Sequence, residues 1–425
     1  MKKLQQQIHY FFPYLLYFLI PVFYYFIASA AETNFVFLNY IFYISCIFLC
    51  AILLLRYYYD FITDNRKILF LFIFCSAMFL FKPPLLSGDI HRYVWEGHVQ
   101  NLGYNPYSIA PDNTIFNNET LNKEVNHPRM TAIYPPLAQI IFRFFSLINP
   151  SLYLFKLFFL LVSLYFVFFL SRKKEFFKDA YLLAALFPFF IIETSSSGHF
   201  DIIGILFLTL AVFYLYQNDG SKSGLFLVFS VLTKIVPVIF LPLFFVNLKK
   251  KQKLYFTAAF TSGFLLYIPY INAGIRLFDS FSTYSKDWVF RGYFYTMMKF
   301  LGFESFYARI FLVFMFLCIY IIIFFKIKNI SENIFLTWLS LFLLSPVAYP
   351  WYLLWLIPFC GKKYFYAAAF FMLASFFTYE VLDKWFCCKN WEENFWLVVL
   401  SYSAATAVSC SIAFSTNWFK EIPKS

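Results

Sequence analysis

Long apolar runs separated by short polar stretches follow one another along most of the chain. A helix needs roughly 17–25 apolar residues to cross the hydrocarbon core of a bilayer. The clearest runs of about this length are Tyr10–Ala30, Phe35–Leu55, Ser151–Leu170 and Ile310–Phe325. The pattern predicts an all-α protein, a polytopic transmembrane helical bundle with roughly twelve to fourteen crossings. We expect one transmembrane domain over residues 1–425.

The composition of the chain excludes an ordinary soluble protein. Of its 425 residues, 62% are hydrophobic and 13% are charged, whereas about a quarter of the residues in a soluble domain are charged. The net charge of +12 would suit nucleic-acid binding, but the basic residues fall in short clusters between the apolar runs. Such clusters orient membrane helices, so we expect membrane lipids and no nucleic acid as partners.

The basic clusters also predict how the chain is oriented. Short loops rich in Lys and Arg lie on the cytoplasmic side of membrane proteins. The residues that this rule places in the cytoplasm include Lys2, Lys3, Arg66, Lys67, Arg172, Lys173, Lys174, Lys250, Lys326, Lys362 and Lys363. The sequence therefore predicts a multi-pass protein of the cytoplasmic (inner) membrane, with both termini in the cytoplasm.

Three stretches depart from the simple alternation of spans and loops. Residues 86–133 are predicted to form the first large external loop, and residues 134–148 an interfacial helix on the outer surface. Residues 224–248 lie between two cytoplasmic clusters and are too few to cross a bilayer of about 30 Å twice. We expect a short membrane hairpin there, with its turn at Lys234–Pro237, because Pro237 interrupts a helix.

Ionisable side chains near the membrane are functional candidates, because the bilayer disfavours them. We expect four groups of candidate residues on the external side. They are Asp89 with Arg92, after the apolar run that follows Lys67; Glu193, His199 and Asp201 in a turn facing outward; Lys234 in the hairpin; and Trp351 within Tyr349–Tyr352.

Each group also has a purely structural interpretation. Asp89 precedes a predicted helix at Ile90–Leu102 and can act as its N-cap. The turn at 193–201 can be a polar turn with satisfied caps, Lys234 can reach the interface with its long side chain, and the aromatic residues 349–352 fit an interfacial belt. Together, however, the groups place carboxylate, imidazole, guanidinium and ammonium on one face of the membrane. That combination suits an enzyme that handles a lipid-linked phosphate.

The motifs of the first loop resemble those of a known class of enzymes. Asp89–Gly97 (DIHRYVWEG), Gly103–Tyr107 (GYNPY) and Tyr134–Gln139 (YPPLAQ) are similar to the first external loop of bacterial C-type (GT-C) integral membrane glycosyltransferases. Within that class, the resemblance is to the polyprenol-phosphate-mannose-dependent mannosyltransferases. Gly198–Asp201 (GHFD) and Lys234–Pro237 (KIVP), with Tyr349–Tyr352 (YPWY), extend the likeness over most of the chain.

This resemblance implies a GT-C-like bundle and a hexosyltransferase reaction. The enzyme would move a sugar, mannose, from a polyprenyl-phosphate donor to a hydroxyl of a glycan or lipid acceptor on the external face. Asp89 occupies the position of the acidic residue that such enzymes carry in the first loop. Many members have paired acids there, whereas this chain has Gly88-Asp89. We therefore predict no cofactor, and the need for a divalent metal stays open.

One carboxylate is sufficient for this chemistry. A base must take the proton of the attacking hydroxyl, whereas the phosphate leaves as a stable anion and needs cations rather than a general acid. A glycoside hydrolase would need two carboxyl groups. Asp89 is the expected base of an inverting transfer. The residues expected to bind the substrates are Arg92, Lys234 and His199, around the phosphate, and Glu193, Asp201 and Trp351.

Two other classes of protein stay open at this point. A transporter or flippase of a lipid-linked or small polar substrate would also be polytopic, and such proteins often contain inverted repeats. No clear repeat is present, and 12 Gly in 425 residues provide few of the small-residue contacts that pack membrane helices closely. A non-catalytic partner in an assembly is the other alternative.

Overall fold

The computed structural model describes residues 19–29, 65–84, 86–177, 180–388 and 390–418. Within these residues the chain is helical, and its β-pairing is limited to isolated bridges from Val347 to Phe290 and Arg291. The predicted all-α class is therefore confirmed. The predicted span Phe35–Leu55 lies outside the described residues, and Tyr10–Ala30 is described over the helix Leu19–Ser29.

The helices of the first half of the described chain differ widely in length. They are α3 (Asn65–Ala77), α4 (Asp89–Asn101), η1 (Thr114–Phe116), η2 (Leu121–Glu124), α5 (Pro136–Ile148), α6 (Leu152–Arg172), α7 (Lys174–Phe177), α8 (Ala180–Leu186), α9 (Pro188–Ile191), η3 (Ile192–Ser196) and α10 (Asp201–Tyr216). Among these, η3 is a π-helical turn and η1 and η2 are 3₁₀ turns.

The helices of the second half of the described chain include long α-helices and several 3₁₀ segments. They are α11 (Gly220–Val231), η4 (Val236–Phe240), α12 (Leu241–Asn247), α13 (Lys250–Ser262), η5 (Gly263–Phe278), α14 (Asp279–Asp287), α15 (Tyr293–Phe300), α16 (Ser305–Lys326), α17 (Ile330–Leu344), η6 (Pro350–Phe359), α18 (Phe365–Phe376), η7 (Phe377–Tyr379), α19 (Glu380–Cys388) and α20 (Phe395–Trp418).

Several of these helices are suited to a membrane. By length and composition, four could cross a bilayer: Leu152–Arg172, Lys250–Asp287, Ser305–Lys326 and Phe365–Leu382. Helices Pro188–Ser196 and Asp201–Tyr216, bent by 118° at the break between them, could make a fifth span. The chain is thus a multi-pass membrane protein. The total of roughly twelve to fourteen crossings stays a prediction.

The span α6 illustrates why the apolar runs become helices. Its 21 residues rise by about 30 Å, the thickness of the hydrocarbon core. The hydroxyl of Ser151 accepts a hydrogen bond from the amide of Tyr153 at the N-terminus, and Arg172 lies in the last turn, where a cation is favoured by the helix dipole. The predicted spans Ser151–Leu170 and Ile310–Phe325 correspond to α6 and α16.

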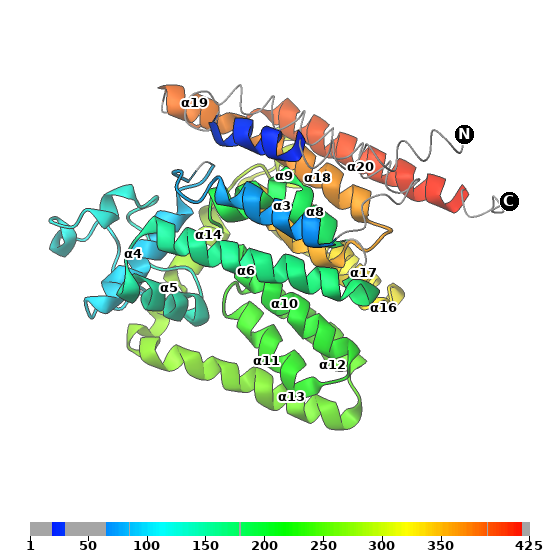
Figure 1. The fold of residues 1–425 in the computed structure, drawn as a ribbon, viewed down its shortest axis with the longest axis horizontal. Coiled ribbons are helices and arrows are strands. Elements are labelled where there is room, and N and C mark those ends of the chain that lie inside the picture. Colours follow the sequence, from blue (N-terminus) through cyan, green and yellow to red (C-terminus); the bar gives the residue numbers. More distant parts are fainter. Residues whose placement is uncertain (1–18, 30–64, 85, 178–179, 389, 419–425) are drawn as a thin grey trace.

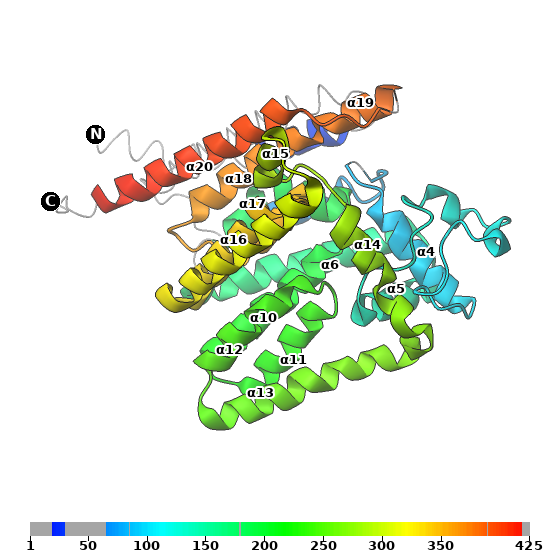
Figure 2. The same ribbon diagram turned by 180° about the vertical axis from the view of Figure 1, so that it is seen from behind.

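The bundle has two distinct ends. Figures 1 and 2 show α4, α5 and the loop that joins them at one end, and the C-terminal ends of α6 and α16 with the α12–α13 connection at the other. Basic residues mark that second end, with Arg172 in the last turn of α6, Lys326 in that of α16, and Lys250 at the start of α13. That this end faces the cytoplasm, as the positive-inside rule predicts, stays a prediction. The predicted cytoplasmic Lys2 and Lys3 lie outside the described residues.

The segment predicted as a hairpin contains two short helical pieces, α11 and η4–α12, joined by residues 232–235. The 12 residues of α11 span about 18 Å, which is less than the roughly 30 Å of the hydrocarbon core. The Leu232 carbonyl oxygen accepts hydrogen bonds from the amides of Leu137 and Ala138. The turn is therefore fastened to the beginning of α5. The position of both segments relative to the bilayer stays a prediction.

Candidate active site

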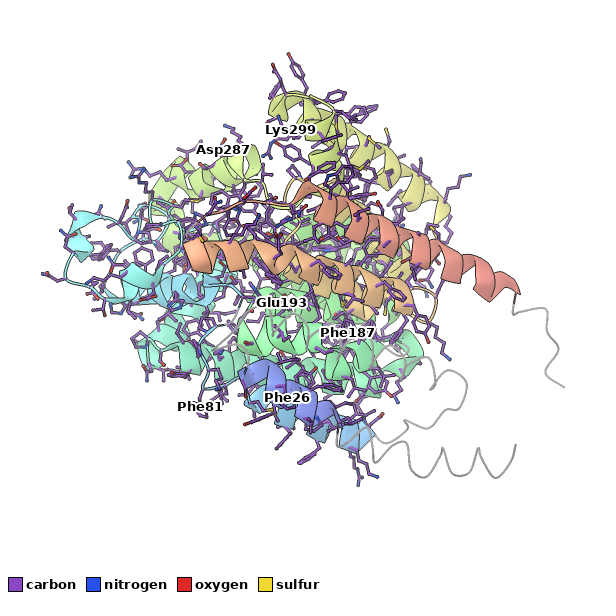
Figure 3. All side chains as sticks on the ribbon, turned by 90° about the horizontal axis from the view of Figure 1, so that it is seen from above. Phe26, Phe81, Phe187, Glu193, Asp287 and Lys299 are labelled. Carbon is purple, nitrogen blue, oxygen red and sulfur yellow. The ribbon has the colours of Figure 1, made fainter. Side chains whose placement is uncertain are left out.

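Side chains from five separate segments meet where α4 begins. Figure 3 shows one of them, Glu193, near the centre of the molecule seen from above. The meeting residues are Asp89 at the start of α4, Glu193 on η3, His199 and Asp201 at the start of α10, Lys234 between α11 and η4, and Trp351 on η6. We call this set the polar cluster. Five of the six expected substrate-binding residues therefore lie in one cluster with the expected base, Asp89. The sixth, Arg92, contacts the loop after α4 instead.

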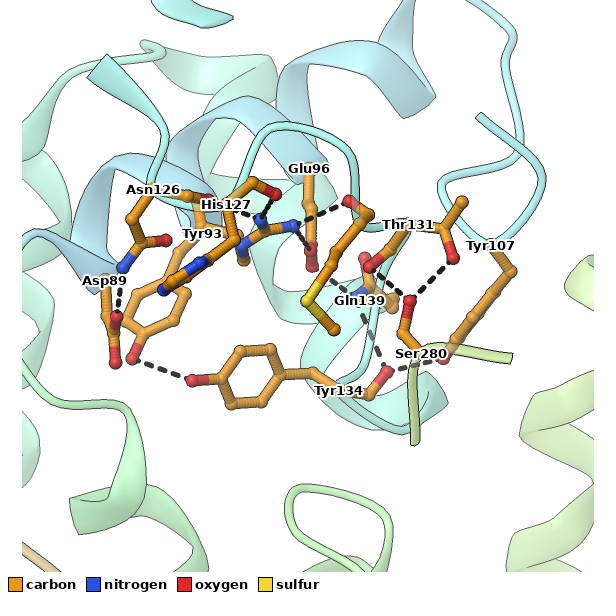
Figure 4. Close-up of polar contacts among 12 residues, drawn as sticks. Asp89, Tyr93, Glu96, Tyr107, Asn126, His127, Thr131, Tyr134, Gln139 and Ser280 are labelled. Atoms are coloured by element: carbon orange, nitrogen blue, oxygen red, sulfur yellow. Dashed lines mark hydrogen bonds and ion pairs between the residues drawn. The ribbon is translucent and has the colours of Figure 1, made fainter. Parts of the chain in front are cut away.

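Asp89 is oriented by the loop and remains accessible. It is the first residue of α4, and Gly88 holds the N-cap position without a side-chain hydrogen bond, so the N-cap interpretation of Asp89 is wrong. Its Oδ1 accepts a hydrogen bond of 2.7 Å from Nδ2 of Asn126 (Figure 4). Its Oδ2 lies 3.9 Å from Nδ1 of His199, and the side chain is 23% exposed. A substrate can thus reach a carboxylate whose direction is fixed.

Arg92 holds the loop rather than pointing into the polar cluster. Its guanidinium donates to the carbonyl oxygens of Asn126 (2.6 Å), His127 (2.9 Å) and Met130 (3.2 Å). The side chain is buried, so these contacts leave it poorly placed for a phosphate. Since Asn126 in turn donates to Asp89, Arg92 supports the expected base from behind.

Glu96 completes this support on the same helix. Its Oε1 lies 3.4 Å from Nη1 of Arg92, and its Oε2 accepts a hydrogen bond of 2.6 Å from Gln139 on α5. Burial raises the pKa of Glu96, and Arg92 and Gln139 act in the opposite direction. Figure 4 shows Glu96 and Gln139 beside each other behind the loop. The α4–α5 pair is therefore joined by a buried polar network.

Replacing Arg92 by Lys is expected to loosen the loop. A single ammonium cannot reach three carbonyl oxygens in the way that a planar guanidinium does, and a buried polar group left without its partner costs about 1–3 kcal/mol. We expect a lower Tm and faster proteolysis within residues 103–133 for Arg92→Lys. Arg129→Lys, at an exposed position of the same loop, is the matched control. Equal Tm values and equal rates of proteolysis in the two variants would contradict this role of Arg92.

His199 and Glu193 form the fully buried part of the polar cluster. Nε2 of His199 lies 3.3 Å from Oε2 of Glu193, although the two atoms are not aligned as a hydrogen bond. Oε1 of Glu193 accepts a hydrogen bond of 2.7 Å from the Tyr379 hydroxyl. The imidazole ring stacks on Trp351, with 3.8 Å between centroids. These groups were expected to face outward, and the structure corrects this because Trp351 and Tyr379 cover them.

Lys234 and Asp201 are ion-paired in a second part of the cluster. Nζ of Lys234 lies 2.5 Å from Oδ1 of Asp201, which also accepts a hydrogen bond of 2.7 Å from Nε1 of Trp355. The ammonium lies over the ring of Tyr352, 3.8 Å from its centroid, a favourable cation–π contact. The side chain of Asp201 is buried, whereas that of Lys234 is 20% exposed. Lys234 is thus a cation with a fixed position and some access to solvent.

The aromatic residues 349–352 do not form a lipid-facing belt as far as the structure describes them. Trp351 is 7% exposed and Trp355 is fully buried. The ring of Trp351 lies between His199 and Tyr349, with centroid distances of 3.8 and 4.3 Å. The belt interpretation is therefore wrong for the tryptophans, which pack against the polar cluster instead.

Two glycines allow the chain to bring these residues together. Gly198 has a φ of 73°, a backbone conformation that glycine adopts without strain, and it turns the chain between η3 and α10. A β-carbon at Gly204 would lie 2.7 Å from both Thr233 and Trp355. Because Gly204 has no side chain, the indole of Trp355 fits against α10 and donates its hydrogen bond to Asp201.

The sequence did not indicate two residues on which this geometry depends. Asn126, which orients Asp89, lies 37 positions further along the chain, and Tyr379 is 186 positions from Glu193. Neither belongs to a motif that marks such a contact. Among the residues that the structure describes, no group of three or more His, Cys, Asp or Glu side chains could hold a metal ion.

The polar cluster combines one partly exposed carboxylate with one cation, and its other carboxylates are buried. Asp89 is partly exposed, whereas the other two carboxylates are buried and engaged by Tyr379, Lys234 and Trp355. Such a site can take a proton from a bound hydroxyl and can place an ammonium against an anionic leaving group.

A comparison with known proteins identifies the family of the chain. The family model described as alpha-(1->6)-mannopyranosyltransferase, N-terminal domain, matches residues 23–250, a range that includes Asp89, Glu193, His199, Asp201 and Lys234. No curated protein and no solved structure showed significant similarity to the chain. Because the model covers more than half of its 425 residues, the chain belongs to the alpha-(1->6)-mannopyranosyltransferase family and is a mannosyltransferase.

Proposed function

We propose that this protein transfers mannose from a polyprenyl-phosphate donor to an acceptor hydroxyl on the external face of the cytoplasmic membrane. The observation that carries the proposal is the partly exposed carboxylate of Asp89, oriented by Asn126 and placed in one cluster with Lys234. Family membership supports the sugar, and the several candidate spans support a donor that resides in the membrane.

In the proposed reaction, Asp89 acts as the base. The acceptor oxygen attacks the anomeric carbon of mannose while its proton passes to Oδ2 of Asp89. The bond between that carbon and the phosphate oxygen breaks, and the phosphate keeps the electron pair. If the product has the alpha linkage named for the family, inversion requires a donor of β configuration. General-base assistance of this kind contributes about 10²–10⁴-fold to a rate.

Lys234 is proposed to stabilise the departing phosphate. One of its three N–H donors is used by Asp201, and the ammonium keeps its charge near the place where negative charge develops. Asp201 and Glu193 are buried and act through Lys234 and His199 rather than by touching the sugar. Arg92 acts through Asn126.

The proposed external face predicts the labelling of single cysteines. Asn113 in the first loop should be external and Lys250 at the start of α13 cytoplasmic. Both side chains are exposed, so cysteines placed there, in a background without the 8 native Cys, are accessible. In intact cells an impermeant thiol reagent should label position 113 and spare position 250 until the membrane is opened. Equal labelling in intact cells would show that the orientation is wrong.

A transfer assay with purified protein tests the proposal itself. Radiolabelled mannosyl polyprenyl phosphate and a mannose-terminated acceptor should give a product that an alpha-mannosidase releases. A nucleotide-activated mannose in place of the lipid donor is the matched control and should give none. Movement of the lipid across the bilayer without product would support the flippase alternative. Transfer from the nucleotide sugar would refute the proposed donor.

A further inference from the structure

We propose that His199 and Glu193 form a buried proton relay behind Asp89. In this relay, which rests on the proposed function, the proton that Asp89 takes from the acceptor is passed to Nδ1 of His199. Glu193 stabilises the imidazolium that results. His199 and Glu193 then act on the proton rather than by binding phosphate or sugar.

The relay follows a continuous line of side chains from four segments. Oδ2 of Asp89 lies 3.9 Å from Nδ1 of His199, Nε2 of His199 lies 3.3 Å from Oε2 of Glu193, and Oε1 of Glu193 accepts a hydrogen bond of 2.7 Å from Tyr379. The exposure of the side chains falls from 23% at Asp89 to zero at His199 and Glu193. The line thus leads from the substrate side into the protein.

Unsatisfied atoms mark the place that a proton would occupy. Oε2 of Glu193 and both ring nitrogens of His199 are buried and make no aligned hydrogen bond. Buried polar atoms of this kind are uncommon and unfavourable. An imidazolium has two N–H donors, one for each of the carboxylates that flank it. Protonation of His199 would therefore satisfy three unsatisfied atoms at once.

A stack of aromatic rings holds the imidazole in its plane. His199 stacks on Trp351, Trp351 on Tyr349, and Tyr349 on Phe290, with centroid distances of 3.8, 4.3 and 4.3 Å. The interplanar angles are 18°, 12° and 22°. Because the stacked rings restrict tilting of the imidazole, its two nitrogens stay near the two carboxylates. Trp351 is thus a positioning residue for His199.

The proton balance of the relay is complete without another reactant. The acceptor O–H bond breaks, and the proton forms an O–H bond with Asp89. That bond then breaks as an N–H bond forms at Nδ1 of His199, while the Nε2–H faces Glu193. The gap of 3.9 Å must close by about 1 Å for this step, because a direct hydrogen bond needs a shorter distance. After the product leaves, the proton returns through Asp89 to water.

This transfer restores the negative charge of Asp89 during the reaction. A protonated Asp89 could return its proton to the product oxygen. An ionised Asp89 instead stabilises the positive charge that develops on the sugar ring. The other ionised pair of the cluster, Lys234 with Asp201, is neutralised internally. The charge on His199 is therefore governed mainly by Asp89 and Glu193.

Glu193→Gln is the variant that tests the relay. An opposite charge beside an ionisable group shifts its titration by about 1–3 pH units. The protein has 5 His, so the imidazole of His199 can be followed by NMR in isotopically labelled protein and assigned by its loss in His199→Gln. In Glu193→Gln its titration midpoint should move to lower pH by about 1 unit or more. An unchanged midpoint would overturn the proposal, whichever donor the enzyme uses.

Kinetics give a second, independent measurement. In Glu193→Gln we expect kcat to fall by about 10–100-fold, with little change in the KM of the donor or of the acceptor. The acidic limb of the pH profile of kcat should move to lower pH. Tyr379→Phe removes the hydrogen bond to Glu193 but keeps its charge, so it should leave that limb in place and separates loss of the charge from a local change in packing. Glu332→Gln is the matched control, because Glu332 also accepts from a tyrosine, Tyr364, outside the polar cluster. Parent-like kcat and pH profile in Glu193→Gln would refute the relay, whereas an inactive parent would refute the proposed donor.

Discussion

Asp89→Asn is expected to lower turnover by about 10²–10⁴-fold with little effect on folding. Asparagine has the same shape, and its Oδ1 can still accept the hydrogen bond that Asn126 donates at 2.7 Å. It cannot take a proton from the acceptor hydroxyl. We expect kcat to carry the loss, the KM of the donor to change little, and the Tm to stay within a few degrees of the parent.

The control for this variant is Asp112→Asn, which removes an exposed carboxylate from the same loop. It should behave as the parent in both assays. If Asp89→Asn lowers the Tm and the folded fraction keeps its turnover, Asp89 would be a structural residue at the start of α4. The base would then have to be sought elsewhere in the polar cluster.

Loss of the Lys234 ammonium is the second large effect that we expect. Lys234→Gln removes the partly exposed cation of the cluster, so use of the polyprenyl-phosphate donor should fall far more than acceptor binding. The same change leaves the buried Asp201 with Trp355 alone, and breaking a buried ion pair costs about 3–5 kcal/mol. The single variant therefore combines a kinetic and a stability defect.

A double variant separates the two defects. In Lys234→Gln with Asp201→Asn the pair is neutral, and the Trp355 indole can still donate to the side-chain oxygen at position 201. We expect this variant to regain stability and to remain defective with the donor. Lys234→Arg should recover part of the donor use, since a phosphate accepts either cation. Parent-like donor kcat and KM in the double variant would show that Lys234 does not contact the phosphate.

The sequence alone was sufficient for the class of protein and for its family, whereas the residues proposed to carry its chemistry stay predictions. An apolar run of about 20 residues has few alternatives to a helix, because lipid offers no partners for backbone polar groups. For this reason Ser151–Leu170 and Ile310–Phe325 became α6 and α16 close to their predicted bounds. The motifs around Asp89, His199 and Lys234 indicated the family that the comparison then showed.

The tertiary structure alone decided what each of those side chains can touch. Arg92 turned from a candidate phosphate ligand into a support of the loop, because the carbonyl oxygens of residues 126–130 fold over it. Glu193 was expected to face outward and is buried, because Tyr379, 186 positions away, closes over it. Local periodicity fixes which face of a helix is apolar, whereas the direction, burial and pairing of a polar side chain depend on segments distant in sequence. Those distant contacts leave the carboxylate of Asp89 partly exposed and bury those of Glu193 and Asp201.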